Sequence, residues 1–278
     1  MKVILAEHAG TCFGVERALT LADDALSGGR AASSLGPLIH NPGVVQDLTS
    51  RGMFVADSVA DIRTDVVVIR SHGVTPAEFR ALAERGADVV DATCPFVTRA
   101  QRAARRLGET FGTVIVVGEA GHPEVEALCA YVRESGARAI VAATPDELAD
   151  ELAGTVGVVV QTTQRASVLD GILEALRARG VEFELADTIC NATAERQDAA
   201  LALARTVDAM VVVGGRHSSN TTRLAEICAL ACPRVFHIEE ASELVAKDFV
   251  GCDTVGLTAG ASTPDSQIAR VLDTLRGF

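Results

Sequence analysis

The stretch VVDATCPFVTRAQRAARRL, residues 89–107, contains the pattern on which the fold prediction depends. An extended run ends in a polar turn at Cys94, and an amphipathic helix is predicted directly after it. The same order recurs in AGTCFGVERAL around Cys12 and in LADTICNATAERQ around Cys190. Three copies of one pattern predict an internal repeat with a period of roughly 90 residues, longer than that of solenoid proteins.

A fixed spacing supports the repeat. Counting 28 residues forward from each cysteine reaches a polar loop that opens a predicted helix, at His40, His122 and Ser218. A second polar loop follows at a less regular distance, around His72, Thr162 and Ser262. We therefore expect each repeat to be one small domain with a cysteine and two polar loops.

Short β-branched runs alternate with amphipathic stretches along the chain. The runs are apolar at consecutive positions, which is typical of strands buried on both faces of a parallel sheet: Val3–Leu5, Val66–Ile69, Val114–Val117, Val156–Val160, Met210–Val213 and Thr254–Leu257. The alternation predicts an α/β fold of three small domains with mainly parallel sheets in a pseudo-threefold arrangement. The expected boundaries are 1–92, 93–188 and 189–278, with a C-terminal helix that packs back on the first domain. Capping boxes predict helix starts at Thr75 and Thr144.

The overall composition excludes several classes of protein. The 278 residues are 48% hydrophobic and 22% charged, as is ordinary for a globular protein. Acidic residues outnumber basic ones 37 to 25, so we expect no nucleic-acid partner. The apolar runs are too short to cross a membrane, and Glu7 interrupts the N-terminal run before a signal peptide could form. We therefore expect a soluble, cytoplasmic protein.

Two nucleotide-binding signatures are missing from the sequence. The only lysines, Lys2 and Lys247, do not follow a glycine, as the lysine of a P-loop would. No Gly-x-Gly occurs, which argues against a Rossmann dinucleotide site.

The cysteines indicate a metal centre. All the polar loops fall after predicted strands, where ligands bind in parallel sheets, and a pseudo-threefold arrangement would bring three thiolates to one axis. Three cysteines suit a 4Fe–4S cluster with one iron left for substrate, and they equally suit zinc with an open position. The remaining four are predicted to be core packing: Cys129, Cys228, Cys232 and Cys252.

The polar loops are suited to an anion. Donor groups come from histidine rings, hydroxyls and an amide: His40, His72, His122, Ser218, Ser219, Asn220 and Ser262. Helix N-termini at these loops favour phosphate, so a phosphorylated small molecule is expected. Glu124, beside His122, could carry protons or merely favour the helix end. Thr162 could serve the site or only cap a helix.

Taken together, these motifs resemble the 4-hydroxy-3-methylbut-2-enyl diphosphate reductase family of the non-mevalonate isoprenoid pathway. The resemblance covers nearly the whole chain and rests on a set of short stretches: CFGVERA, IHNPGVV, SHGV, DATCPFVT, GHPEVE, QTT, TICNAT, SSNTTRLAE and TAGAST. It implies three α/β domains around one 4Fe–4S cluster per chain, held by Cys12, Cys94 and Cys190. It also implies a substrate diphosphate held by His40, His72, His122, Ser218, Ser219, Asn220 and Ser262.

The resemblance further implies a reaction. Glu124 and Thr162 would deliver protons and Thr162 would also contact the substrate, while two electrons from a ferredoxin or flavodoxin remove its hydroxyl as water. The products would be isopentenyl and dimethylallyl diphosphates. Two alternatives stay open on the sequence alone, a hydro-lyase with a three-cysteine cluster and a non-enzymatic, metal-dependent binding module for a phosphate ligand.

Overall fold

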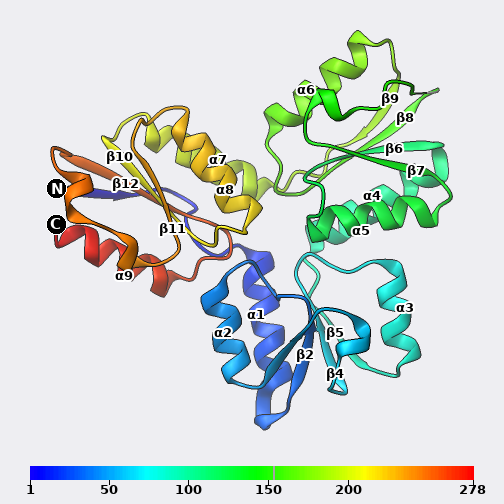
Figure 1. Cartoon of the computed structure of the whole chain (residues 1–278), viewed down its shortest axis with the longest axis horizontal. Coiled ribbons are helices and arrows are strands. Elements are labelled where there is room, and N and C mark those ends of the chain that lie inside the picture. The colour runs from blue at the N-terminus through cyan, green and yellow to red at the C-terminus, as the bar shows by residue number, and fades with distance from the viewer. Residues whose placement is uncertain (153) are drawn as a thin grey trace. The chain divides into compact units, whose positions relative to one another are not determined.

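The computed structural model describes residues 1–152 and 154–278. This part of the chain forms three parallel sheets of four strands each, together with nine α-helices (Figure 1). The predicted α/β class with parallel sheets is therefore confirmed. Among the helices that the structure describes, each is too short or too polar to span a lipid bilayer.

The three sheets have the same internal order. The first is β3-β2-β4-β5, from β2 (Ala32–Leu35), β3 (Met53–Ala56), β4 (Val66–Ile69) and β5 (Asp88–Asp91). The second is β7-β6-β8-β9, from β6 (Thr113–Val117), β7 (Arg138–Ala142), β8 (Val156–Val160) and β9 (Phe183–Ala186). The third is β1-β12-β10-β11, from β1 (Lys2–Leu5), β10 (Ala209–Val213), β11 (Val235–Ile238) and β12 (Thr254–Ala259).

Each α-helix comes directly after a strand or the loop that follows it. They are α1 (Phe13–Leu26), α2 (Pro42–Ser50), α3 (Pro76–Glu84), α4 (Pro95–Thr110), α5 (Pro123–Glu134), α6 (Ala166–Ala178), α7 (Asn191–Ala204), α8 (Ser219–Ala229) and α9 (Asp265–Arg276). Short 3-10 turns occupy Ser27–Gly29, Val59–Asp61, Pro145–Glu147, Ala241–Glu243 and Ala246–Phe249.

The sheets confirm the threefold repeat and reveal a permutation of it. Reversing the third sheet gives β11-β10-β12-β1, which matches the other two strand for strand. The fourth position belongs to β1, which pairs in parallel with β12 through Lys2 and Thr254. The boundaries 1–92, 93–188 and 189–278 stay a prediction, and this pairing argues against assigning the first strand to the first domain.

By its internal contacts the chain divides into two units. Unit 1 is Met1–Glu16, His40–Val44 and Asn191–Phe278, and it contains the third sheet. Unit 2 is Arg17–Ile39 and Val45–Cys190, and it contains the first and second sheets.

The core of unit 2 lies on both faces of its sheets. Along β6, Val114 and Val116 pack with residues of α4 and α5, whereas Ile115 and Val117 pack with residues of α6. All four side chains are fully buried, and each contributes about 2 kcal/mol of burial free energy. Burial on both faces explains why the strand is apolar at every position.

Unit 1 is built in the same way. In β10, Met210 and Val212 face α7 and α8, whereas Val211 and Val213 face α9. The C-terminal helix α9 thus packs on the sheet that contains β1 and β12.

Most predicted elements are confirmed with small shifts of their ends. All six predicted strands are present, and the extended runs before Cys94 and Cys190 are β5 and β9. Strands β2, β3, β7 and β11 were not predicted. The capping box at Thr75 opens α3. The box at Thr144 is formed, but it opens only the 3-10 turn Pro145–Glu147, because Leu148 returns to an extended conformation.

Candidate active site

The three cysteines of the repeat occupy equivalent positions. Each follows the fourth strand of a sheet and lies directly before α1, α4 or α7. Each backbone N–H donates to a carbonyl of a second polar loop: Cys12 to Ala261 at 3.2 Å, Cys94 to Ser71 at 2.9 Å and Cys190 to Thr162 at 2.9 Å. These bonds join Cys94 and Cys190 to the second polar loop of the preceding sequence repeat, and Cys12 to that of the third, so they do not follow the predicted grouping of each cysteine with the two polar loops after it.

The two groups of cysteines differ in burial. Cys12, Cys94 and Cys190 are half-buried, whereas the other four are buried. Burial raises the pKa of Cys129 to about 11 and that of Cys228 to about 12, so these thiols stay protonated. Cys228 and Cys232 pack in the core between β10, α7 and α8, as predicted for packing residues.

Unit 2 joins Glu124 to Thr162. Glu124 lies in the first turn of α5, after β6, and Thr162 follows β8, the neighbouring strand. The Thr162 backbone N–H donates to Glu124 Oε1 at 2.7 Å, and its hydroxyl donates to Oε2 at 2.9 Å. Both side chains are buried. The parallel sheet thus places a carboxyl group and a hydroxyl group in direct contact at its carboxyl edge.

Burial sets the acidity of this carboxyl group. Desolvation raises the pKa of Glu124 from 4.5 to about 7, although the two hydrogen bonds from Thr162 act in the opposite direction. A carboxyl group with such a pKa holds a proton near neutral pH and can donate it to a reacting group.

Two histidines lie near this pair in unit 2. His122 is the N-cap of α5, and its Nδ1 accepts from the Glu124 N–H at 3.1 Å, so in the neutral ring the proton is on Nε2. The His72 ring contacts the His122 ring edge-on, with centroids 5.6 Å apart. His72 follows β4 and His122 follows β6, so the two rings come from different repeats.

Unit 1 contributes a second group of polar loops. Ser218 is the N-cap of α8, and its hydroxyl accepts from the Thr221 N–H at 3.3 Å. Ser219 and Asn220 are also buried, and neither the Nδ2 nor the Oδ1 atom of Asn220 has a hydrogen-bond partner within the described residues. A buried amide in this state is costly unless a ligand satisfies it. The loop therefore fits a polar ligand.

His40 and Ser262 complete the predicted residues of unit 1. His40 precedes α2 and Ser262 precedes α9, and both are half-buried. The His40 carbonyl lies so close to Gly215 that a Cβ atom there would be 2.7 Å away. The close approach requires glycine and fixes the His40 loop against the loop that leads to Ser218.

Sequence reasoning missed two buried residues of unit 1. Asn41 Nδ2 donates to the Ser262 carbonyl at 2.9 Å and to Gln267 Oε1 at 3.0 Å. The available signal was the Asn-Pro pair after His40, which is typical of a helix start, but nothing in the sequence indicated the partners.

The donor set fits the groups that the sequence predicts. Three equivalent cysteines, each directly before a helix, suit soft metals, because sulfur ligands select such metals. Histidine, hydroxyl and amide donors beside the N-termini of α2, α5 and α8 suit an anion. Each unit therefore holds donors suited to an anion, and unit 2 also holds a buried carboxyl group that can supply a proton.

Comparison with known proteins agrees with this chemistry. The model of the family described as LytB protein matches residues 3–276. The 4-hydroxy-3-methylbut-2-enyl diphosphate reductase of Geobacter sulfurreducens is 45% identical over 278 residues, which cover 100% of this chain and 98% of the relative. The reductase of the same name from Trichlorobacter lovleyi is 45% identical over 276 residues, 99% of this chain and 98% of the relative.

Two solved structures are similar to nearly the whole of this chain. The structure of (E)-4-hydroxy-3-methyl-but-2-enyl diphosphate reductase, described as the terminal enzyme of the non-mevalonate pathway, is 39% identical, covers 100% of both chains and has a TM-score of 0.71. A reductase structure from Plasmodium falciparum is 22% identical, covers 99% of this chain and 87% of that chain, and has a TM-score of 0.90, which supports the fold alone. The predicted resemblance is thus confirmed, and this chain belongs to the LytB family of reductases.

Proposed function

We propose that this chain reduces (E)-4-hydroxy-3-methylbut-2-enyl diphosphate to isopentenyl and dimethylallyl diphosphates. The substrate accepts two electrons and two protons, its C–O bond breaks, and its hydroxyl leaves as water. The observation that carries the proposal is the buried Glu124 carboxyl group, which holds a proton near neutral pH beside Thr162 and His122.

The proposed cofactor is one 4Fe–4S cluster, held by Cys12, Cys94 and Cys190. Their equivalent places before α1, α4 and α7, and the helix N-termini there, support thiolate ligation. When bound, a cluster with three protein ligands supplies electrons singly and one iron that can act as a Lewis acid toward the substrate hydroxyl.

The proposed diphosphate ligands are the polar groups of the loops: His40, His72, His122, Ser218, Ser219, Asn220 and Ser262. The unsatisfied buried amide of Asn220 supports this assignment most directly. His122 would donate through Nε2, since its Nδ1 accepts from the backbone. Imidazole, hydroxyl and amide donors, together with helix ends, would bind the anion here without a lysine.

Glu124 and Thr162 are the proposed catalytic residues. The protonated carboxyl group of Glu124 would supply a proton to the leaving hydroxyl or to the allylic carbon. The Thr162 hydroxyl orients that carboxyl group and would contact the substrate. Because both residues are buried, bulk water has little access to this carboxyl–hydroxyl pair.

The proposed partner is an external one-electron donor of the ferredoxin or flavodoxin type. The reaction consumes two electrons, and the residues of this chain supply none of them. A cytoplasmic location is proposed as well, because cysteines that must ligate iron need a reducing compartment.

Anaerobic turnover of the allylic diphosphate with a strong one-electron reductant tests the function. We expect a brown protein with about four irons per chain that forms both products. Cys12→Ser, Cys94→Ser and Cys190→Ser should each lose iron and turnover, whereas the core variant Cys232→Ala should retain both. A colourless, zinc-loaded wild type without turnover would refute the proposal, and turnover without added reductant would indicate a hydro-lyase.

A further inference from the structure

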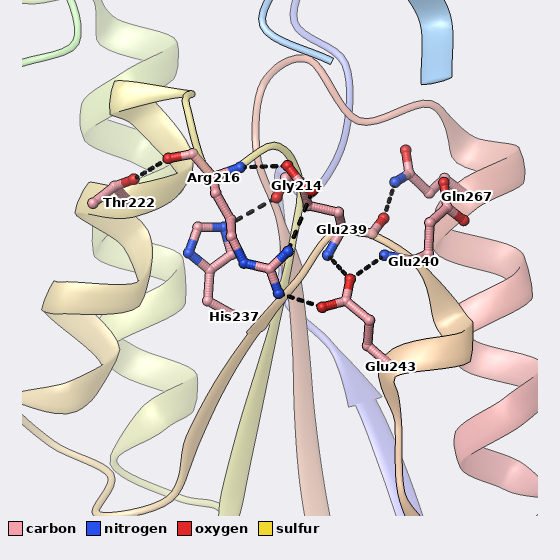
Figure 2. A network of polar contacts seen from close by, with 8 residues as sticks. All are labelled: Gly214, Arg216, Thr222, His237, Glu239, Glu240, Glu243 and Gln267. Atoms are coloured by element: carbon pink, nitrogen blue, oxygen red, sulfur yellow. Dashed lines mark hydrogen bonds and ion pairs between the residues drawn. The ribbon is translucent and has the colours of Figure 1, made fainter. Parts of the chain in front are cut away.

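A network of polar contacts borders the loop that leads to Ser218 (Figure 2). Arg216 follows β10, and its backbone N–H donates to Glu239 Oε1 at 2.8 Å. Its guanidinium group pairs with Glu239 Oε2 at 3.2 Å and with the Glu243 carboxylate. These two carboxylates raise the pKa of Arg216, with Glu243 as the larger cause. The positive charge of Arg216 is therefore balanced by the Glu239 and Glu243 carboxylates within the network.

Two buried amides extend this network toward the other polar loops of unit 1. Gln267, in the first turn of α9, donates through Nε2 to the Glu239 carbonyl. Its Oε1 atom accepts from Asn41 Nδ2 at 3.0 Å, and the same nitrogen donates to the Ser262 carbonyl at 2.9 Å. Asn41 Oδ1 accepts from the Val44 N–H at 3.1 Å at the start of α2.

We propose that Asn41 and Gln267 are positioning residues that hold the diphosphate-binding loops of unit 1 in register. This inference rests on the proposed function, in which His40, Ser218 and Ser262 bind the diphosphate. Asn41 is adjacent to His40 in the sequence and is hydrogen-bonded to the Ser262 carbonyl. Gln267 connects Asn41 to Glu239, the residue that binds Arg216. Neither amide needs to touch the ligand.

Burial strengthens the bridge of hydrogen bonds that Asn41 and Gln267 form between the loops. Asn41 is 3% exposed and Gln267 is 6% exposed, so water cannot easily replace a lost hydrogen bond. Removing either amide leaves a partly buried carbonyl, of Ser262 or of Glu239, without the donor that holds its loop, and the loop can then move. Because several loops bind one anion, such a movement should weaken anion binding more than it slows the chemical step.

The test uses the iron-loaded full chain and inorganic diphosphate as the probe, with binding measured by anaerobic calorimetry. We expect Asn41→Ala to weaken binding about tenfold and to raise KM by a similar factor, with kcat changed less than about threefold. Gln267→Ala should weaken binding about fivefold. The double variant should be no weaker than Asn41→Ala alone, because both substitutions break one bridge.

Gln46→Ala is the matched control, since Gln46 is exposed on α2 and its substitution should leave binding unchanged. Asn41→Asp keeps the Oδ1 acceptor for Val44 but removes the N–H donors. We expect it to bind diphosphate no better than Asn41→Ala, because the oxygen that replaces Nδ2 faces two acceptors, the Ser262 carbonyl and Gln267 Oε1.

Two results would overturn the inference. One is wild-type binding in both Asn41→Ala and Gln267→Ala, and the other is a double variant whose loss equals the product of the single losses. Failure of the proposed function would look different, because the wild type itself would then fail to turn over the allylic diphosphate.

Discussion

Thr162 donates two hydrogen bonds to one carboxyl group, that of Glu124, at 2.7 Å from its backbone nitrogen and 2.9 Å from its hydroxyl. The two residues are 38 positions apart in the sequence and meet because β6 and β8 are neighbours in a parallel sheet. Full burial raises the pKa of the carboxyl group to about 7 despite these bonds, so the group is partly protonated at neutral pH. The pair therefore combines a proton source with the group that orients it.

Glu124→Gln should keep the cluster and diphosphate binding but lower kcat by a factor of roughly 10²–10⁴, because the amide has nearly the same shape and no transferable proton. The measurement is anaerobic steady-state turnover, with iron content determined on the same samples. Glu126→Gln is the matched control, because Glu126 is an exposed glutamate of the same helix and should retain wild-type turnover. Wild-type kcat in Glu124→Gln would remove the proton role.

The same carboxyl group should make stability depend on pH. Its pKa is raised from 4.5 to about 7 in the folded protein, so between these values the folded state binds more protons than the unfolded state. The free energy of unfolding should therefore fall as pH rises from 4.5 to 7, by about 3 kcal/mol relative to Glu124→Gln. Denaturant midpoints of both proteins across this range measure the difference. A constant difference across the range would contradict the raised pKa.

Thr162→Val should separate orientation of the carboxyl group from its acidity. The hydroxyl hydrogen bond lowers the pKa of Glu124, so its removal should raise that pKa and move the alkaline limb of the kcat profile to higher pH. We expect kcat at its optimum to fall about tenfold, since the carboxyl group loses one of its two donors. Thr162→Ser restores the hydroxyl and should restore the profile. An unshifted limb in Thr162→Val would show that the hydroxyl does not act through Glu124.

How far the fold could be predicted depended on where each strand lies in its sheet. Five of the six predicted strands, β4, β6, β8, β10 and β12, have a neighbour on each side, and burial on both faces makes them mainly apolar. Strands β3, β7 and β11 are at sheet edges, and β7 and β11 each contain a polar residue, Arg138 and His237. The central strand β2 reads Ala-Ser-Ser-Leu and escaped prediction because its buried serines look like a loop.

The residues of the candidate site could also be predicted only in part. The cysteine spacing predicted Cys12, Cys94 and Cys190, because each repeat places its cysteine before a helix. Nothing local indicated Asn41 and Gln267, which meet 226 residues apart through tertiary packing. A side chain that contacts only other loops carries no periodic signal in the sequence. The sequence also did not predict that β1 belongs to the third sheet, because its partner β12 lies at the other end of the chain.

The contact between Gly215 and His40 gives the last prediction. A Cβ atom on residue 215 would lie 2.7 Å from the His40 carbonyl oxygen, and a backbone atom cannot rotate away as a side chain can. Gly215→Ala should therefore displace the His40 loop and weaken inorganic diphosphate binding about tenfold, with iron content unchanged. Gly112→Ala is the control, because nothing lies within 4 Å of a Cβ atom there. Calorimetry on both variants decides the point, since equal affinity would mean that the loop absorbs the methyl group without moving a ligand of the diphosphate.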